Sequence, residues 1–208
     1  MNKSTKTTSI RVWDWPVRVF HWSLALSVLI AFLTGESEQF SLLHQTLGFV
    51  AAGLLAFRFS WGFVGTRYAK FSEFVKGPLA IWHYLKSMRD GHPQHHVGHN
   101  PVGGLAVLLL MCLVGLTAFT GWVIAAGDAP GWQEELHEIV ANTLIGVVVL
   151  HVLGVLVSSY LHKENLIRAM LTGFKNGTAE QGISRGWWGI GVLLVAAMVA
   201  FCMTQLQL

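Results

Sequence analysis

Two histidines belong to a long apolar stretch in the second half of the chain. Between Ile139 and Leu161 about 23 residues carry no formal charge. At a rise of ~1.5 Å per residue, such a run is long enough to cross a bilayer as a helix. His151 lies within the run and His137 lies just before it. Because a polar side chain at membrane depth is costly without a partner, both imidazoles are candidates for binding a ligand.

The spacing of His137 and His151 places both imidazoles on one helix face. They are 14 residues apart, and at ~100° per residue the second returns close to the direction of the first, roughly 21 Å further along the axis. One face therefore offers an imidazole near each membrane surface. Either histidine alone is more simply explained as a buried side chain hydrogen-bonded to backbone. A function for the pair requires matching histidines on other helices.

The composition indicates a membrane protein. Hydrophobic residues make up 53% of the 208 residues and charged residues only 12%, whereas about a quarter of the residues in soluble globular proteins are charged. We therefore predict an all-α polytopic membrane protein. The two cysteines, Cys112 and Cys202, lie in apolar runs without a C-x-x-C-H or C-x-x-C pattern. This excludes covalently attached haem and cysteine-based zinc or dithiol sites.

Five apolar runs are predicted to be transmembrane helices, at approximately residues 17–34, 42–64, 102–126, 136–161 and 187–203. Apart from Arg58, every Lys and Arg lies at or before the start of the first run, between the second and third, or between the fourth and fifth. The alternate connections contain acids and no base. Because basic residues mark cytoplasmic loops, we expect a cytoplasmic N-terminus and a C-terminus on the other side.

Histidines on the first two predicted helices match the depths of the first pair. His21 lies 14 residues before Gly35, at the outer end of the first helix. His151 lies a similar distance from the outer end of the fourth helix, so the two should share a level near the inner surface. His44 begins the second helix at the outer surface, at the level of His137. The sequence thus predicts an inner pair, His21 with His151, and an outer pair, His44 with His137.

Imidazole pairs at two depths suit b-type haem, a cofactor with two axial positions that is held without covalent attachment. Zinc prefers three or four protein ligands, and no acid or cysteine is placed in the membrane to complete such a site. Gly48 and Gly154, near His44 and His151, leave room for a flat macrocycle, although glycines also serve close helix packing. Arg58, 14 residues after His44, is placed to pair with a propionate of the inner haem. Snorkelling of Arg58 to the inner interface is an equal alternative.

The longest connection, residues 65–100, is predicted to lie at the cytoplasmic surface. Its segment FSEFVKGPLAIWHYLKSMR mixes aromatic and basic residues, as a helix lying on an anionic leaflet does. The loop histidines that follow are expected in water rather than in a surface metal site. They are His92, His95, His96 and His99. Asp14 with Pro16, and Asn100 with Pro101, are expected to cap the first and third helices.

Several stretches resemble the bacterial cytochrome b561 and nickel–iron hydrogenase cytochrome b subunit family. They are VWDWPVRVFHW, HQTLG, RFSWGFVG, GHNPVGG, LHE followed after 14 residues by LHVLG, and HKENLIRAM. The resemblance covers about residues 9–175. It implies a four-helix core in the bacterial inner membrane that binds two b haems and passes electrons between quinone and a periplasmic redox partner. The residues that match the ligand positions of the family are His21, His44, His137 and His151.

The resemblance also suggests a division of the chain. Residues 1–184 are predicted to form the four-helix haem domain, with its cytoplasmic loop at 65–100. Residues 185–208 are predicted to add a C-terminal transmembrane helix, which departs from the shorter core of the family.

Three functions are open at this point. The first is an electron-transfer subunit between the quinone pool and a periplasmic cytochrome c or hydrogenase. The second is a self-contained superoxide:quinone oxidoreductase, and the third is a histidine-based transporter. A transport path favours intramembrane carboxylates or broken helices, and neither is evident.

The outer connections favour the first function. They carry five acids and no base, namely Glu36, Glu38, Asp128, Glu134 and Glu135. This charge suits docking of a lysine-rich cytochrome better than collection of superoxide anion. An electron-transfer subunit is therefore favoured over a stand-alone enzyme, with membrane lipid and quinone as further partners and no nucleic acid.

Overall fold

The protein is a bundle of long helices in a computed structural model that describes residues 8–92, 94–127 and 130–207. Within these residues, five helices are long and apolar enough to cross a membrane. They are α1 (Trp15–Thr34), α2 (Ser41–Val64), α5 (Pro101–Ala125), α6 (Gly131–His162) and α8 (Trp188–Leu206). The predicted all-α polytopic fold is thereby confirmed.

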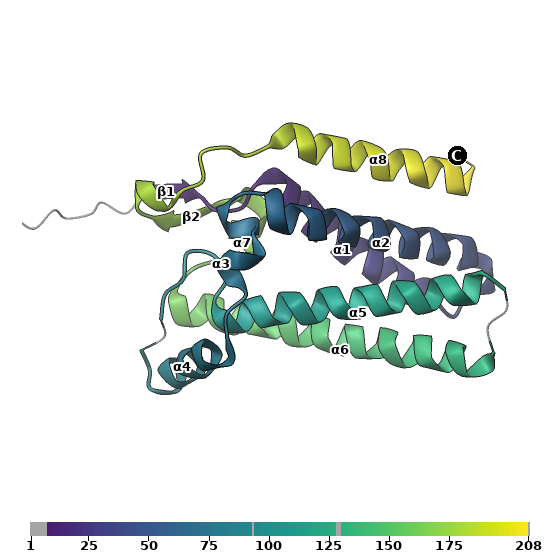
Figure 1. The fold of residues 1–208 in the computed structure, drawn as a ribbon, viewed down its shortest axis with the longest axis horizontal. Helices are drawn as coiled ribbons and strands as arrows, with labels where there is room; N and C mark the ends of the chain where they lie inside the picture. Colours follow the sequence, from purple (N-terminus) through teal and green to yellow (C-terminus); the bar gives the residue numbers. More distant parts are fainter. Residues whose placement is uncertain (1–7, 93, 128–129, 208) are drawn as a thin grey trace, which may run out of the picture.

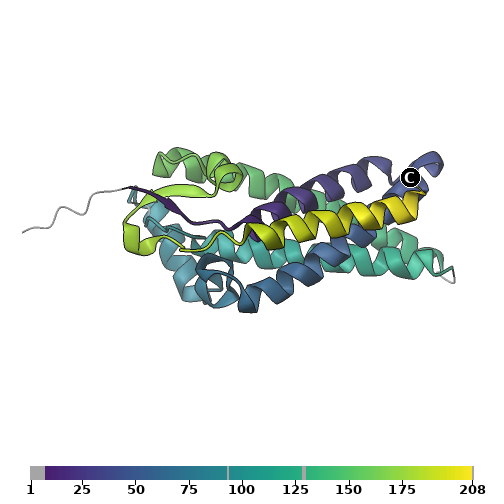
Figure 2. The same cartoon turned by 90° about the horizontal axis from the view of Figure 1, so that it is seen from above.

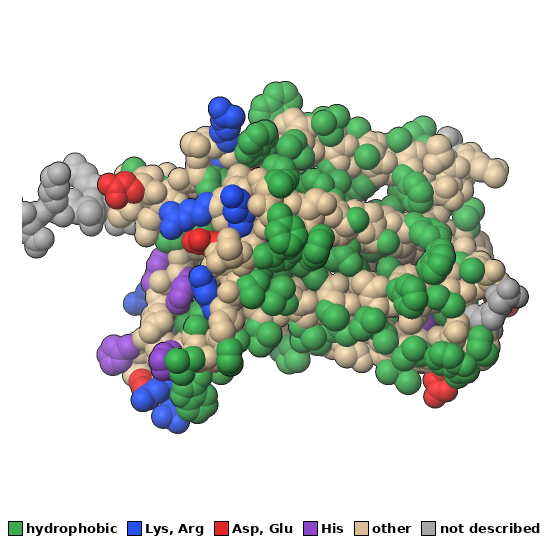
Figure 3. Space-filling model, in the orientation of Figure 1, with side chains coloured by type: hydrophobic (Ala, Val, Ile, Leu, Met, Phe, Trp, Pro, Cys, Tyr) green, Lys and Arg blue, Asp and Glu red, His purple; other side chains and the backbone are tan. Residues whose placement is uncertain are grey.

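The long helices run alongside one another (Figures 1 and 2). α1 packs on α2, α2 on α5 and α5 on α6, while α8 lies outside these four, against α1 and α2. Large apolar side chains face outward along the bundle, among them Leu33, Leu150 and Leu193. Figure 3 shows this apolar surface over the middle of the molecule. Helices whose outer faces are apolar are expected to contact lipid rather than water.

One end of the bundle carries most of the short elements (Figure 1). They are β1 (Thr8–Arg11), α3 (Phe71–Phe74), α4 (Pro78–Arg89), α7 (Leu166–Thr172) and β2 (Phe174–Gly177). Lys, Arg and His side chains gather there (Figure 3), and we call it the basic end. The opposite end, formed by the α1–α2 and α5–α6 connections, is called the acidic end.

Asp14 ties the start of α1 to the end of α2. Its Oδ1 accepts a hydrogen bond from the backbone N–H of Val17 at 2.8 Å, which is the predicted cap, and Pro16 lies in the first turn. Its Oδ2 accepts from Trp61 Nε1 at 3.0 Å and from Thr66 Oγ1 at 2.6 Å. Since Asp14 is buried, these bonds offset the cost of removing its charge from water. A local cap therefore also sets the position of α1 relative to α2.

The connection after α2 differs from the single surface helix that the sequence predicts. The structure divides it into α3 and α4, separated by an extended Gly77 with ψ of 166°. Pro78 is the reason, because its ring disfavours helical backbone at the preceding residue. α4 does present Leu79 and Trp82 outward, but it buries Tyr84 against the bundle.

Two further features differ from the sequence prediction. α6 begins directly after Pro130, so Glu134 and Glu135 lie on the first turns of the helix rather than in a loop. The antiparallel pairing of β1 with β2, which places Thr8 opposite Gly177, was not anticipated. Each strand has only four residues, and the two strands are more than 160 residues apart in the sequence. Asn100, as predicted, caps α5 by accepting from Gly103 N at 2.7 Å.

Candidate functional site

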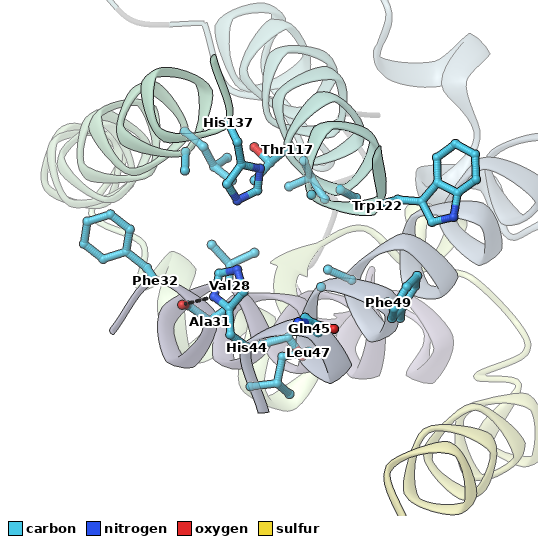
Figure 4. A pocket seen from close by; sticks show the side chains of 18 of the residues that line it. Val28, Ala31, Phe32, His44, Gln45, Leu47, Phe49, Thr117, Trp122 and His137 are labelled. Carbon is cyan, nitrogen blue, oxygen red and sulfur yellow. Dashed lines mark hydrogen bonds between the residues drawn. The ribbon is translucent and has the colours of Figure 1, made fainter. Parts of the chain in front are cut away.

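His44 and His137 face each other at the acidic end of the bundle. His44 lies in the first turn of α2 and His137 near the start of α6. Their ring centroids are 6.1 Å apart and their planes are inclined by 79°. Figure 4 shows the two imidazoles on opposite sides of an open space. The structure therefore brings together the two histidines of the predicted outer pair, here called the acidic-end pair.

The space beside these rings is a cavity lined by α1, α2, α5 and α6. The empty space between the lining side chains is about 760 Å³, including the part that opens to the surroundings. Most lining side chains are apolar, such as Val28, Leu47 and Leu144. Gly48 also lines it, and a Cβ added there would meet no atom within 4 Å. The glycine thus leaves open space beside His44, as the sequence analysis expects.

Both imidazoles of the acidic-end pair keep one nitrogen free. His44 Nδ1 donates to the carbonyl oxygen of Ala31 at 2.8 Å. His137 Nδ1 lies 2.9 Å from the Thr120 hydroxyl oxygen. That hydroxyl donates to a backbone carbonyl of its own helix, so it accepts from His137. The Nε2 of each ring therefore keeps its lone pair. A hydrogen-bonded Nδ1 with a free Nε2 is the usual arrangement of a metal-ligating histidine.

The separation of the rings fits two axial ligands of one iron. With metal–imidazole bonds of about 2 Å, rings on opposite sides of one metal would have centroids roughly 6 Å apart, close to the observed 6.1 Å. Among the described residues, no three or more His, Cys, Asp or Glu side chains are grouped to hold a metal ion, so they form no tetrahedral zinc site. The residues present fit a b-type haem, which needs only two axial ligands from the protein.

His21, His151 and Arg58 come together nearer the basic end, on α1, α6 and α2 respectively. His21 and His151 are close enough to interact electrostatically, and both lie close to His99, as does Arg58. The predicted inner pair, here called the basic-end pair, is thus at one level of the bundle. His99, a loop histidine that was not predicted to belong to this site, lies near the pair.

Three nitrogens in this group are buried and have no hydrogen-bond partner among the described residues. They are His21 Nδ1, Arg58 Nη1 and His99 Nδ1. A buried polar group left unpaired costs about 1–3 kcal/mol, and the Arg58 guanidinium, which can only donate, requires a group that accepts hydrogen bonds. The Arg58 guanidinium is held inside, with its carbon 5.3 Å from the ring centre of Phe71 and 5.5 Å from that of Phe74. A buried carboxylate would suit it.

For His99, the prediction of a histidine in water is wrong. Its ring centroid lies 4.8 Å from that of Trp13 and 4.8 Å from that of Phe74. The residue is half-buried and its Nδ1 is fully buried, so the ring packs against the bundle rather than extending into water. Burial lowers the pKa of His99 to about 3, followed in effect by the nearby Arg58 and then by His151, His21 and Lys175. His99 is therefore neutral at physiological pH and cannot repel a cationic neighbour.

The other loop histidines are closer to expectation, since His92 and His95 are exposed, although His96 is half-buried. The sequence GHNP around His99 contains a local indication that this part of the loop packs against the bundle. His99 directly precedes Asn100, the cap of α5, and a Cβ on Gly98 would lie 2.6 Å from the Tyr68 ring. A glycine that permits such a close approach indicates that the loop is pressed against the bundle.

The acidic end exposes the carboxylates that the sequence predicts there. They are Glu36, Glu38, Glu134 and Glu135. The fifth predicted acid, Asp128, lies outside the described residues. The charged surface and the acidic-end pair therefore belong to the same end of the molecule.

Comparisons with known proteins agree with this geometry. A family model described as prokaryotic cytochrome b561 matches residues 12–173. The probable Ni/Fe-hydrogenase B-type cytochrome subunit of Rhodobacter capsulatus is 24% identical, over 82% of this chain and 82% of its own length. That of Azotobacter vinelandii is 24% identical, over 83% of this chain and 91% of its own length.

A further relative is the probable Ni/Fe-hydrogenase 1 B-type cytochrome subunit of Escherichia coli (strain K12), 22% identical over 84% of this chain and 94% of its own length. No solved structure matches the chain at a significant level.

Proposed function

The chain belongs to the prokaryotic cytochrome b561 family and is a multi-pass b-type cytochrome that carries electrons. From this premise we propose that it holds two b haems in the bacterial inner membrane and carries electrons between the quinone pool and a periplasmic redox partner. The observation that supports the proposal most directly is that the imidazoles of His44 and His137 face each other, with their ring centroids 6.1 Å apart. Their hydrogen bonds leave an Nε2 free on each ring.

The side chains divide into two proposed haem sites. His44 and His137 would provide the axial ligands near the acidic end, and His21 and His151 those near the basic end. When bound, the two haems would supply one-electron carriers at two depths of the membrane. Ala31 and Thr120 orient the acidic-end imidazoles, and the apolar lining of the cavity excludes water.

Arg58 is proposed to bind a propionate of the haem near the basic end. Its guanidinium is buried and Nη1 has no partner among the described residues, and a carboxylate would accept hydrogen bonds from it. His99, also without a partner at Nδ1, is proposed as a second donor to the same group. A neutral imidazole supplies a hydrogen bond beside Arg58 without adding like charge.

The distribution of charge supports an orientation in the membrane. Lys and Arg at the basic end favour placing that end in the cytoplasm, with the acidic end in the periplasm. The relatives are named as probable Ni/Fe-hydrogenase B-type cytochrome subunits. By analogy, the periplasmic partner of this chain is proposed to be a hydrogenase, or a basic cytochrome c. The α1–α2 and α5–α6 connections at the acidic end are too short to form a catalytic domain themselves.

Quantitation of haem per mole of purified protein as the pyridine haemochrome tests the proposal. We expect two b haems per chain, and a ratio near zero or one would contradict the two-site arrangement. Reduced protein should then be oxidised by a short-chain quinone, or reduced by the corresponding quinol. Failure of both reactions would remove the quinone from the proposal.

A further inference from the structure

Hydrogen-bonding side chains form a line from the surface of the basic end into the bundle. His162 is the last residue of α6, and its Nε2 lies 3.3 Å from the Tyr84 hydroxyl of α4. Ser158, one turn earlier on α6, lies close enough to the same hydroxyl to influence it. A tyrosine hydroxyl both donates and accepts. It can therefore connect the imidazole to the serine in either tautomer of His162.

The outer end of this line opens to water. His162 and His95 line a polar cleft at the surface together with Glu164 and Thr178. The ring centroids of His95 and His162 are 5.9 Å apart, and the His95 side chain is 52% exposed. The cleft thus gives His162 access to protons from the aqueous phase.

The inner end of the line is enclosed. Tyr84 is 1% exposed and Ser158 is 7% exposed. Ser158 lies seven residues after His151 on the same helix, so at ~100° and ~1.5 Å per residue it is on nearly the same face, roughly 10 Å closer to the basic end. The line therefore leads from water toward the interior that His151 faces.

The charged groups around the line are largely paired. Lys175 Nζ lies 2.8 Å from Glu164 Oε2, and it also donates to the backbone carbonyl of Val97 at 3.0 Å. His95 Nε2 lies 3.9 Å from the same carboxylate, and the His96 ring lies against Tyr84 with centroids 5.6 Å apart. Burial raises the pKa of Tyr84, an effect partly offset by the nearby Ser158 hydroxyl. Tyr84 therefore stays protonated and would pass protons by exchanging hydrogen bonds, not by ionising.

We propose that His162, Tyr84 and Ser158 conduct protons between the aqueous phase at the basic end and a quinone bound inside that end of the bundle. The inference rests on the proposed reaction with quinone. Reduction of a quinone to the quinol consumes two electrons and two protons. The electrons come from the reduced cytochrome, and the protons enter from water along this line. Oxidation of a quinol returns both protons along the same side chains.

The test uses full-length protein with its haems, oriented in vesicles, reduced and then mixed with a short-chain quinone. Tyr84→Phe removes the hydroxyl but keeps the ring, His162→Gln removes the imidazole, and Ser158→Ala removes the inner hydroxyl. Tyr160→Phe is a matched control, because Tyr160 lies on α6 but is 84% exposed. His92→Gln is the second control, at an exposed loop histidine.

Two signals are followed together: oxidation of the cytochrome and proton uptake reported by a pH dye on the basic-end side. In Tyr84→Phe and His162→Gln both should slow by about 10²-fold, the low end of what a positioned proton donor contributes. Haem content, absorption spectrum and reduction by dithionite should match wild type in all variants. Added imidazole should restore much of the rate in His162→Gln, which a merely structural defect would not allow.

Wild-type rates and proton uptake in all three line variants would overturn the relay, as would uptake from the acidic-end side. If wild-type protein with two haems fails to react with quinone, the proposed function itself is overturned and the relay with it. The wild-type reaction with quinone distinguishes these cases. The control variants show that any slowing in the line variants does not arise from substitution in α6 or in the loop as such.

Discussion

At the residue scale, each proposed haem site depends on one imidazole from α6 and one from another helix. If each pair shares an iron, His44→Ala and His137→Ala should remove the same spectral component. His21→Ala and His151→Ala should remove the other component. Low-temperature optical spectra of membranes, resolved by redox titration, measure this, with His92→Ala as an exposed control. Loss of one common component in His21→Ala and His44→Ala would refute the pairing by depth.

The burial of the His99 imidazole nitrogen Nδ1 predicts how the free energy of unfolding depends on pH. In the folded protein burial lowers its pKa to about 3, whereas an exposed histidine titrates near 6.5. As pH falls below about 6.5, the unfolded chain binds a proton that the folded chain does not. The His99 contribution to stability is therefore complete above that pH and is lost progressively toward pH 3. At pH 5 the loss is roughly 2 kcal/mol.

The variant His99→Phe isolates this effect, because it keeps an aromatic ring between Trp13 and Phe74 and removes the titration. Its free energy of unfolding should fall less than that of wild type between pH 7 and pH 5. Unfolding in mixed detergent, followed by circular dichroism at both pH values, measures the difference. His92→Phe serves as the exposed control. Equal losses in wild type and His99→Phe would show that His99 is not held neutral.

At the element scale, α8 is an addition to the helices that bear the histidines. It contacts α1 closely at Gly191, where an added Cβ would lie 3.2 Å from Trp15 Cβ. Gly191→Leu should therefore push α8 away from α1 and destabilise the protein by about 1–3 kcal/mol. Because the four proposed ligands lie on α1, α2 and α6, haem content should change little.

Gly189→Leu is the matched control for α8, since a Cβ at Gly189 meets no atom within 4 Å. Unfolding of both variants and pyridine haemochrome content separate packing from haem binding. Loss of haem in Gly191→Leu at unchanged stability would mean that α8 helps to build a haem site. The division at residue 185 would then be wrong.

At the scale of the whole molecule, charge is distributed unequally between the two ends. Exposed Glu36, Glu38 and Glu134 act mainly by steering, over a range near ~8 Å at physiological salt. Reversing all three to Lys should slow oxidation of the reduced protein by a basic cytochrome c by on the order of 10-fold. The wild-type rate should fall as ionic strength rises. Stopped-flow spectroscopy measures both rates.

Glu180→Lys is the control for these reversals, since Glu180 is exposed but lies at the basic end. The same three reversals should raise any rate with superoxide, an anion. If wild-type protein reacts with superoxide near the diffusional limit, and its rates with cytochromes ignore salt and these charges, a self-contained superoxide:quinone oxidoreductase would replace the electron-transfer subunit.

The long helices and the depths of the four histidines could be predicted from the sequence because both depend on local properties. An apolar run of sufficient length becomes a membrane helix, and the helical period fixes the level of His21, His44, His137 and His151 along it. The caps at Asp14 and Asn100 are equally local, since each side chain bonds a backbone N–H three residues away.

Only the tertiary structure decided which polar groups are buried at the basic end. His99 lies in a polar loop and is expected in water, yet its ring packs against Trp13 and Phe74 and its Nδ1 is buried. The sequence predicts Tyr84 on a surface helix, yet its hydroxyl lies within hydrogen-bonding distance of His162, the last residue of α6. These contacts join segments distant in sequence, so no local pattern encodes them. They follow from how the helices and the folded connection pack against one another.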